Sequence, residues 1–155
     1  MEFNAAHWHL MLNHVPVLGP FFLALILAIG LARRSRELAR LGLALTLLFP
    51  VATYVVTQTG EKAEHYVEDL PWFDEDRVHD HEERGEAALI ASGVAGILAL
   101  VGLWVSRKGA ELKPAMTLLV LLAVLVAAGM MALTALDGGV IRHEELRPPG
   151  ESIQV

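Results

Sequence analysis

The chain has 155 residues, a formal net charge of −6 and no cysteine. This length is typical of one domain, and the lack of cysteine excludes disulfides, thiolate metal sites and covalent haem attachment through CxxCH. Apolar residues make up 54% of the chain and the mean hydropathy is +0.47, above the usual share of a soluble globular domain.

Four stretches of the chain carry no charged side chain: residues 15–32, 41–59, 87–105 and 114–136. An apolar run of about 18 residues or more crosses a bilayer core of roughly 30 Å as a helix. We therefore predict an all-α fold, an integral membrane four-helix bundle that forms a single domain over residues 1–155. The predicted spans are about 8–32, 41–66, 78–106 and 114–137, with an acidic outer loop at 67–77 and an outer C-terminal tail at 138–155.

The first predicted span contains LMLNHVPVLGP (residues 10–20), in which two hydrogen-bonding side chains, Asn13 and His14, interrupt an apolar run. Pro16 and Pro20 remove backbone hydrogen bonds, so a bend is expected there. We interpret His14 as a ligand or hydrogen-bonding residue, with the alternative that it satisfies carbonyls freed by the prolines. It shares one helical stripe with His7, Met11 and Leu18.

The later spans also carry polar residues near the end of the bundle at which His14 is expected. The second span continues past the membrane as a polar stripe that includes Glu61 and His65. The third begins with HDHEERGE (79–86), and the fourth is expected to stop at Gly138 and Gly139. A face of small residues on the third span favours either close helix packing or room for a flat ligand. That face is His81, Gly85, Ala88, Ser92, Ala95 and Ala99.

The short links 33–40 and 106–113 hold seven basic and two acidic residues. By the positive-inside rule they face the cytoplasm, so both termini and the long connection face outward. The outer side then holds 16 acidic and 5 basic residues and all seven histidines. One histidine from each helix, His14, His65, His81 and His143, is expected at one rim, as in interior sites of four-helix bundles.

Four motifs support a family resemblance: LNHVPVLG (12–19), TGEKAE (59–64), HEERGEAAL (81–89) and GGVIRHEE (138–145). Their order resembles a widespread bacterial family of small four-span membrane proteins that is catalogued as a domain of unknown function. The resemblance implies the four-helix fold and a location in the bacterial cytoplasmic (inner) membrane. Relatives often carry a carboxylate where this chain has His65, and His7, His9 and His79 fall outside the family pattern. The matching residues are Asn13, His14, Pro16, Gly60, Glu64, His81, Glu82, Gly139, Arg142 and His143.

The leading functional hypothesis is a b-type haem protein that transfers electrons near the outer membrane face. A haem needs one or two axial imidazoles, an apolar slot and cations for its propionates. The candidate ligands are His14, His65, His81 and His143, and Arg84 and Arg142 are the candidate propionate partners. The acidic outer loop would attract a basic soluble electron carrier.

Two alternatives remain open. A non-haem divalent transition metal would be held by His14, His81 and His143 with Glu64 or Glu82. A non-catalytic subunit of a larger membrane complex would use its small-residue faces to pack against other subunits or a second copy. Nucleic-acid binding is disfavoured because the basic residues are few. Without GxxxxGK[ST] or GxSxG motifs, we expect a binding or electron-transfer protein rather than a hydrolase or transferase.

Overall fold

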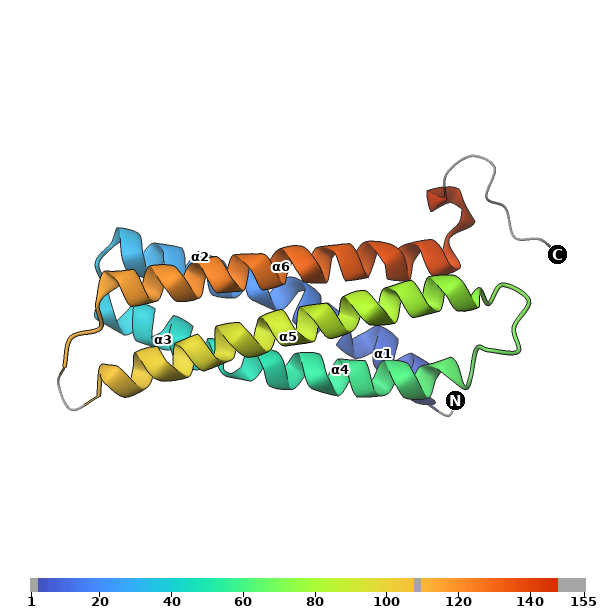
Figure 1. The fold of residues 1–155 in the computed structure, drawn as a ribbon, viewed down its shortest axis with the longest axis horizontal. Helices are drawn as coiled ribbons and strands as arrows, with labels where there is room; N and C mark the ends of the chain where they lie inside the picture. The colour runs from blue at the N-terminus through green and yellow to red at the C-terminus, as the bar shows by residue number, and fades with distance from the viewer. Residues whose placement is uncertain (1–2, 108–109, 148–155) are drawn as a thin grey trace.

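The computed structural model describes residues 3–107 and 110–147, and within these ranges it contains helices and no β-strand. The helices lie side by side along one long axis (Figure 1). In chain order they are α1 (Ala5–Leu12), α2 (His14–Ala32), α3 (Arg36–Thr46), α4 (Leu48–Glu64), α5 (Glu75–Val105), α6 (Pro114–Arg142) and the short 3-10 helix η1 (Glu144–Leu146).

Two pairs of helices follow each other without a loop, so the chain runs the length of the bundle four times. The four passes are Ala5–Ala32, Arg36–Glu64, Glu75–Val105 and Pro114–Arg142, and they contain 28 to 31 residues each. At 1.5 Å per residue they measure roughly 42–46 Å, more than the hydrocarbon thickness of roughly 30 Å. All four are long and apolar enough to cross a membrane, which confirms the predicted all-α, four-span fold.

Large apolar side chains cover the outside of the bundle. Phe22, Ile90, Ile97 and Val126 are each exposed by more than 60% of their surface. Such a contiguous apolar exterior is unfavourable in water but suits contact with lipid chains. The surface therefore agrees with a multi-pass membrane protein.

The two interruptions inside the spans have the same cause. Pro16 and Pro50 have no N–H, so they cannot bond to the carbonyls of Leu12 and Thr46. α1 ends at Leu12 and α3 ends at Thr46, and the next residue in each case lies between two helices. The break that the prolines of the first span predict thus occurs at Asn13, whereas Pro20 lies inside the continuous helix α2.

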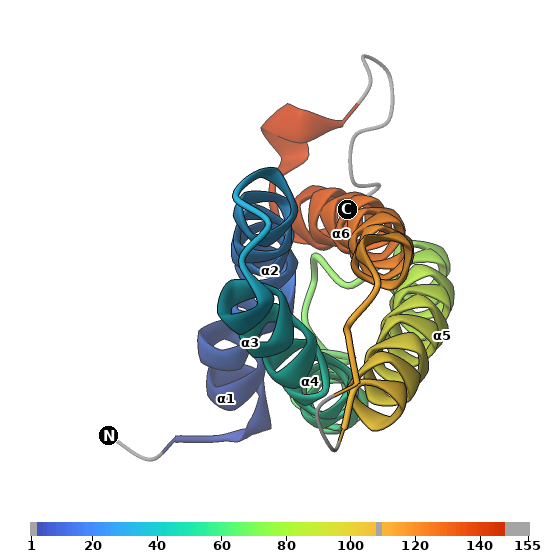
Figure 2. The same ribbon diagram turned by 90° about the vertical axis from the view of Figure 1, so that its left-hand side faces the viewer.

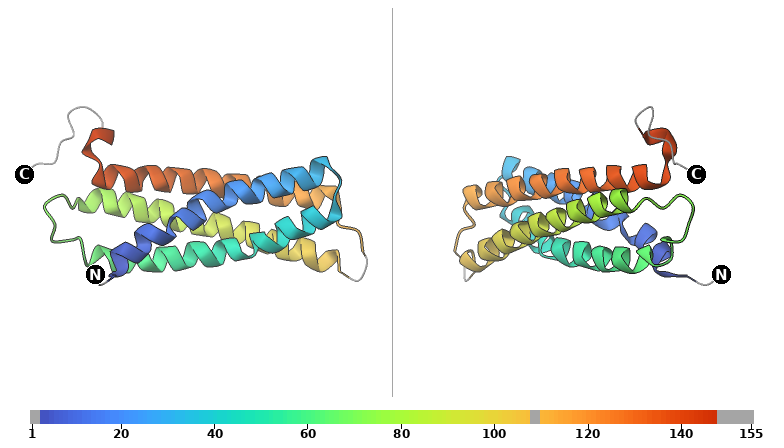
Figure 3. Two further views of the ribbon diagram at one scale, coloured as in Figure 1. Left: turned by 180° about the vertical axis from the view of Figure 1, so that it is seen from behind. Right: turned by 45° about the vertical axis from the view of Figure 1, so that its right-hand side comes forward.

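The two ends of the bundle differ in charge. The end that we call acidic carries the α4–α5 connection, the start of α1 and the end of α6 (Figures 1 and 3). The opposite, basic end carries the α2–α3 and α5–α6 links, as predicted. These links are joined by Arg36, which donates to the carbonyl of Ala110, and by Arg40, which donates to that of Ser106.

Three helices begin earlier than predicted, and the first of them, α1, begins at Ala5 rather than near 8. α3 begins at Arg36 rather than near 41, because the Ser35 hydroxyl caps it by accepting the Leu38 N–H at 3.3 Å. α5 begins at Glu75 rather than near 78, capped in the same way by Asp74. The predicted loop at 67–77 is correspondingly shorter.

α6 does not stop at Gly138 and Gly139, so that prediction is wrong: the helix continues to Arg142. Arg147 folds back and donates to the carbonyls of Val140 and Ile141, which stabilises the longer helix end. The first residues of the predicted tail are therefore helical, and residues 148–155 of it lie outside the described residues.

The packed core occupies only part of the bundle length. Leu27, Leu43, Val120 and Val124 are fully buried and lie between the middle and the basic end. Towards the acidic end, the last buried residues of the long helices are Pro16 on α2, Thr53 on α4, Ala88 on α5 and Met131 on α6, and α1 has none. In the described residues, no fully buried apolar side chain fills the interior beyond this level.

Candidate functional site

His9 on α1 contacts α4 in that less filled part of the bundle. Its Nδ1 lies 3.1 Å from the carbonyl oxygen of Val56 and 3.3 Å from the Thr59 hydroxyl. Gly60, four residues after Val56, leaves space for the ring, since a Cβ at Gly60 would lie 3.1 Å from His9 Cε1. The ring can reach the carbonyl because residue 60 has no side chain.

His81 on α5 makes the equivalent contact with α6. Its Nδ1 lies 2.9 Å from the carbonyl oxygen of Thr134, and a Cβ at Gly138 would lie 3.1 Å from His81 Cε1. Gly138 again follows the accepting carbonyl by four residues. The two halves of the chain therefore build the same unit. In each, a histidine on one span contacts the carbonyl of residue i on the following span and packs on the glycine at i+4.

These contacts determine the tautomer of both rings. A carbonyl oxygen only accepts hydrogen bonds, so each Nδ1 must carry a hydrogen and donate it. In a neutral imidazole the lone pair is then on Nε2, the nitrogen that metals bind, and the carbonyl fixes the ring orientation. Among the described residues, neither Nε2 has a hydrogen-bond partner.

His9 and His81 lie on two helices that both reach the acidic end of the bundle. α1 and α5 lie on different sides of the bundle, and α4 lies between them (Figure 2). α1 packs on α4 and on the start of α2, and in the described residues it does not approach α5 or α6 to packing distance. The two rings are nevertheless close enough for a charge on His81 to act on His9.

Asn13 adds a second polar group to the same face of α1. It follows His9 by one helical turn, and its Oδ1 is buried with no hydrogen-bond partner among the described residues. A buried polar atom without a partner is uncommon in folded proteins, and its usual explanation is a bound ligand, a bound water molecule or local strain. The region beside His9 thus holds a buried polar atom without a partner among the described residues.

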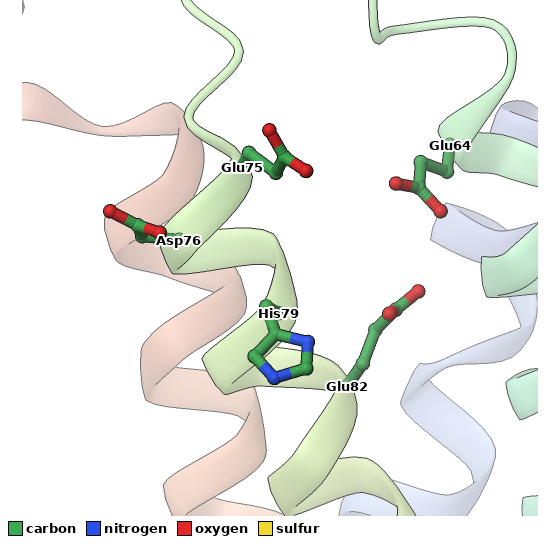
Figure 4. A pocket seen from close by; sticks show the side chains of 5 residues that line it. All are labelled: Glu64, Glu75, Asp76, His79 and Glu82. Carbon is green, nitrogen blue, oxygen red and sulfur yellow. The ribbon is translucent and has the colours of Figure 1, made fainter.

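An acidic pocket opens at the acidic end of the bundle. It has a volume of about 310 Å³ and is lined by Glu64 on α4 and by Glu75, Asp76, His79 and Glu82 on α5. Figure 4 shows Glu64 facing Glu75 and Glu82 across the opening. Glu82 directly follows His81 on α5, and the four carboxylates of the pocket give the acidic end a concentrated negative charge.

Three of the predicted ligand histidines lie on the surface. His14 is exposed, as are the other members of its predicted stripe, so this face of the helix points away from the bundle interior. His65 is exposed by 77% and lies 3.8 Å from a Glu68 carboxylate oxygen. His143 Nδ1 lies 2.9 Å from Glu145 Oε1, and the Glu145 backbone amide together with this hydrogen bond lowers the pKa of the Glu145 carboxyl.

The two predicted propionate partners have other contacts. Arg84 Nη1 lies 2.8 Å from Asp137 Oδ1, an ion pair that joins α5 to α6. The Arg142 guanidinium lies 4.9 Å from the centre of the Trp72 ring, a cation–π contact. Of the predicted metal ligands, Glu64 and Glu82 line one pocket, but among the described residues no three His, Asp or Glu side chains gather as a metal-binding group.

His9 is the site residue that the sequence interpretation left out. The signal lies in the spacing of α1 and α2, where Pro16, Pro20, Leu23 and Leu27 are buried at steps of four, three and four. Extending this stripe backwards reaches Asn13 and then His9, not His14. The buried stripe of α5 runs from Ala88 through Ser92, Ala95 and Ala99, and it reaches His81 in the same way, as predicted.

Comparisons of the chain with protein-family models, with curated proteins and with solved structures found no match. The family resemblance described above therefore stays a prediction.

Proposed function

We propose that the protein binds a b-type haem at the acidic end of the bundle, between the α1–α4 and α5–α6 pairs, with His9 and His81 as its two axial ligands. The observation that supports this most strongly is the repeated unit of histidine, carbonyl and glycine. It holds two neutral imidazoles in the same tautomer, with Nε2 available on each, in an interior that no fully buried apolar side chain fills.

A haem suits this arrangement better than a bare metal ion. A haem iron needs only two protein ligands, since the porphyrin supplies four nitrogens. A bare transition metal is usually held by three or four side chains, and the described residues gather no such group. We therefore prefer haem to the alternative metal set His14, His81, His143, Glu64 and Glu82.

The proposed function is electron transfer. When bound, a haem with two axial imidazoles supplies a one-electron redox centre and has no open position for a substrate. The chain's own residues orient the imidazoles through Val56 and Thr134 and exclude bulk water from their apolar edges. Arg142, which has no ion pair among the described residues, is the better candidate partner for a propionate, because Arg84 is already paired with Asp137.

The topology and partners follow the same proposal. The basic end faces the cytoplasm of a bacterial cell and the acidic end, with both termini, faces outward. A basic soluble electron carrier would then dock on the acidic pocket beside the haem. Membership of the four-span family is part of the proposal, since Gly60, His81 and Gly138 of the repeated unit all lie in its motifs.

The experiment is to express the protein with ample haem, purify it in detergent and measure haem per chain from the reduced-minus-oxidised absorbance. We expect about one haem per chain, and at least a several-fold loss in His9→Ala and in His81→Ala. His14→Ala is the matched control, because it removes an exposed imidazole from the same span, and it should keep its haem. Normal haem content in both interior variants, or none in the unmodified protein, would contradict the proposal.

A further inference from the structure

The two histidine units are not identical, because they differ at the residue that precedes each glycine. On α4 this residue is Thr59, whose hydroxyl donates to the Val56 carbonyl at 2.7 Å and lies 3.3 Å from His9 Nδ1. On α6 it is Asp137. The same position of the repeated unit thus carries a neutral hydroxyl beside His9 and a carboxylate beside His81.

Among the described residues, only one of the two carboxylate oxygens of Asp137 has a partner. Its Oδ1 lies 2.8 Å from Arg84 Nη1, and Arg84 follows His81 by three residues on α5. Its Oδ2 is buried and has no hydrogen-bond partner among the described residues. Asp137 directly precedes Gly138, on which the His81 ring packs, whereas the equivalent position beside His9 carries no carboxylate.

A fixed charge beside an axial ligand changes the reduction potential of a haem. The ferric haem core carries one more positive charge than the ferrous core, so a nearby anion stabilises the ferric form and lowers the potential. A nearby cation has the opposite effect. This effect is largest where water screens the charge least, and the Asp137 side chain is exposed by only 22%.

We infer that Asp137 is the residue that lowers the reduction potential of the bound haem, acting on the iron through His81, and that Arg84 limits the size of this effect. The inference rests on the proposed haem site. On this inference a carboxylate acts on the His81 ligand and only a hydroxyl on the His9 ligand. The two ligands therefore differ electrostatically although their contacts are repeated.

The test is an equilibrium redox titration, at pH 8, of the haem in the unmodified protein and in Asp137→Asn and Arg84→Gln variants. Asp137→Asn should raise the midpoint potential, since it removes an anion while keeping the side-chain shape. Arg84→Gln should lower the potential, since it leaves Asp137 without its cation. Both changes break the same ion pair, so a merely structural role would shift the potential in the same direction in both.

Glu83→Gln is the matched control for charge. Glu83 is also a carboxylate close to His81 in sequence, but its side chain is exposed by 69% and pairs with His79. Its removal should shift the potential less than Asp137→Asn does. Shifts of equal sign in the two ion-pair variants, or an Asp137→Asn shift no larger than the control, would overturn the inference while leaving the haem site intact. A lack of haem in the unmodified protein would instead overturn the proposed function.

Discussion

A single missing Cβ decides whether each histidine can reach its carbonyl. At Gly60 and at Gly138 an added methyl group would lie 3.1 Å from the Cε1 atom of the facing ring, which is closer than ordinary van der Waals contact. The ring would have to move away from the carbonyl that sets its tautomer. Groups that orient a metal ligand in this way strongly affect metal affinity although they never touch the metal.

Gly60→Ala and Gly138→Ala should therefore each weaken haem binding by about 10–100-fold, the usual effect of losing such a group. The measurement is a haem titration of the apoprotein in detergent, followed by the Soret absorbance. Gly129→Ala on α6 is the control, because nothing lies within 4 Å of a Cβ at that position. Equal affinity in all three variants would show that neither glycine supports a ligand.

At the scale of the helices, close backbone packing joins α2 and α3 at the basic end. α2 and α3 approach each other closely at Gly30, where a Cβ would lie 2.9 Å from the backbone nitrogen of Ala39. Backbone atoms cannot move aside as a flexible side chain can. The adjoining turn is tight, since Arg34 adopts a positive φ of 52°.

Gly30→Ala should destabilise the bundle by about 1–3 kcal/mol, the typical cost of overpacking. Thermal unfolding in detergent, followed by circular dichroism, measures the effect as a lower Tm. Gly19→Ala in the same span has no atom within 4 Å of its Cβ and should leave the Tm nearly unchanged. If the two variants unfold at the same temperature, the close approach of α2 and α3 does not contribute to stability.

The helices were largely predictable, whereas the site was only half predictable. Four uncharged runs are long enough to span a bilayer, and Pro16 explains the break at Asn13. Run length and proline chemistry were therefore sufficient to predict the helices. Periodicity also placed His81 on an interior face. His14 was chosen as a candidate ligand because it lies in a recognisable motif, but its helix face is exposed in the structure. The long-range contact between His9 and Val56 depends on how two helices pack, which spacing within one helix does not reveal.

For the whole molecule, the dominant feature is its division into an acidic and a basic end. The pocket lined by Glu64, Glu75, Asp76, His79 and Glu82 places negative charge next to the proposed haem. Attraction between such a surface and a basic partner accelerates their association and is screened by salt.

Electron exchange with a positively charged soluble cytochrome should therefore slow several-fold when the ionic strength rises from about 0.01 M to about 0.15 M, as the Debye length falls from roughly 30 Å to roughly 8 Å. Stopped-flow absorbance gives the second-order rate. Glu64→Gln should reduce the rate at low salt, and an uncharged small-molecule reductant serves as the control. A rate that is independent of salt would exclude electrostatic docking at this end.

The central claim is that His9 and His81 bind one iron, and the electron paramagnetic resonance spectrum of the oxidised, detergent-purified protein tests it most directly. The unmodified protein and His14→Ala should give a low-spin ferric signal typical of two axial imidazoles. His9→Ala and His81→Ala should each lose that signal, either to a high-spin signal or through loss of haem. A low-spin signal that persists in both interior variants, or a haem-free protein made with ample haem, would contradict the claim.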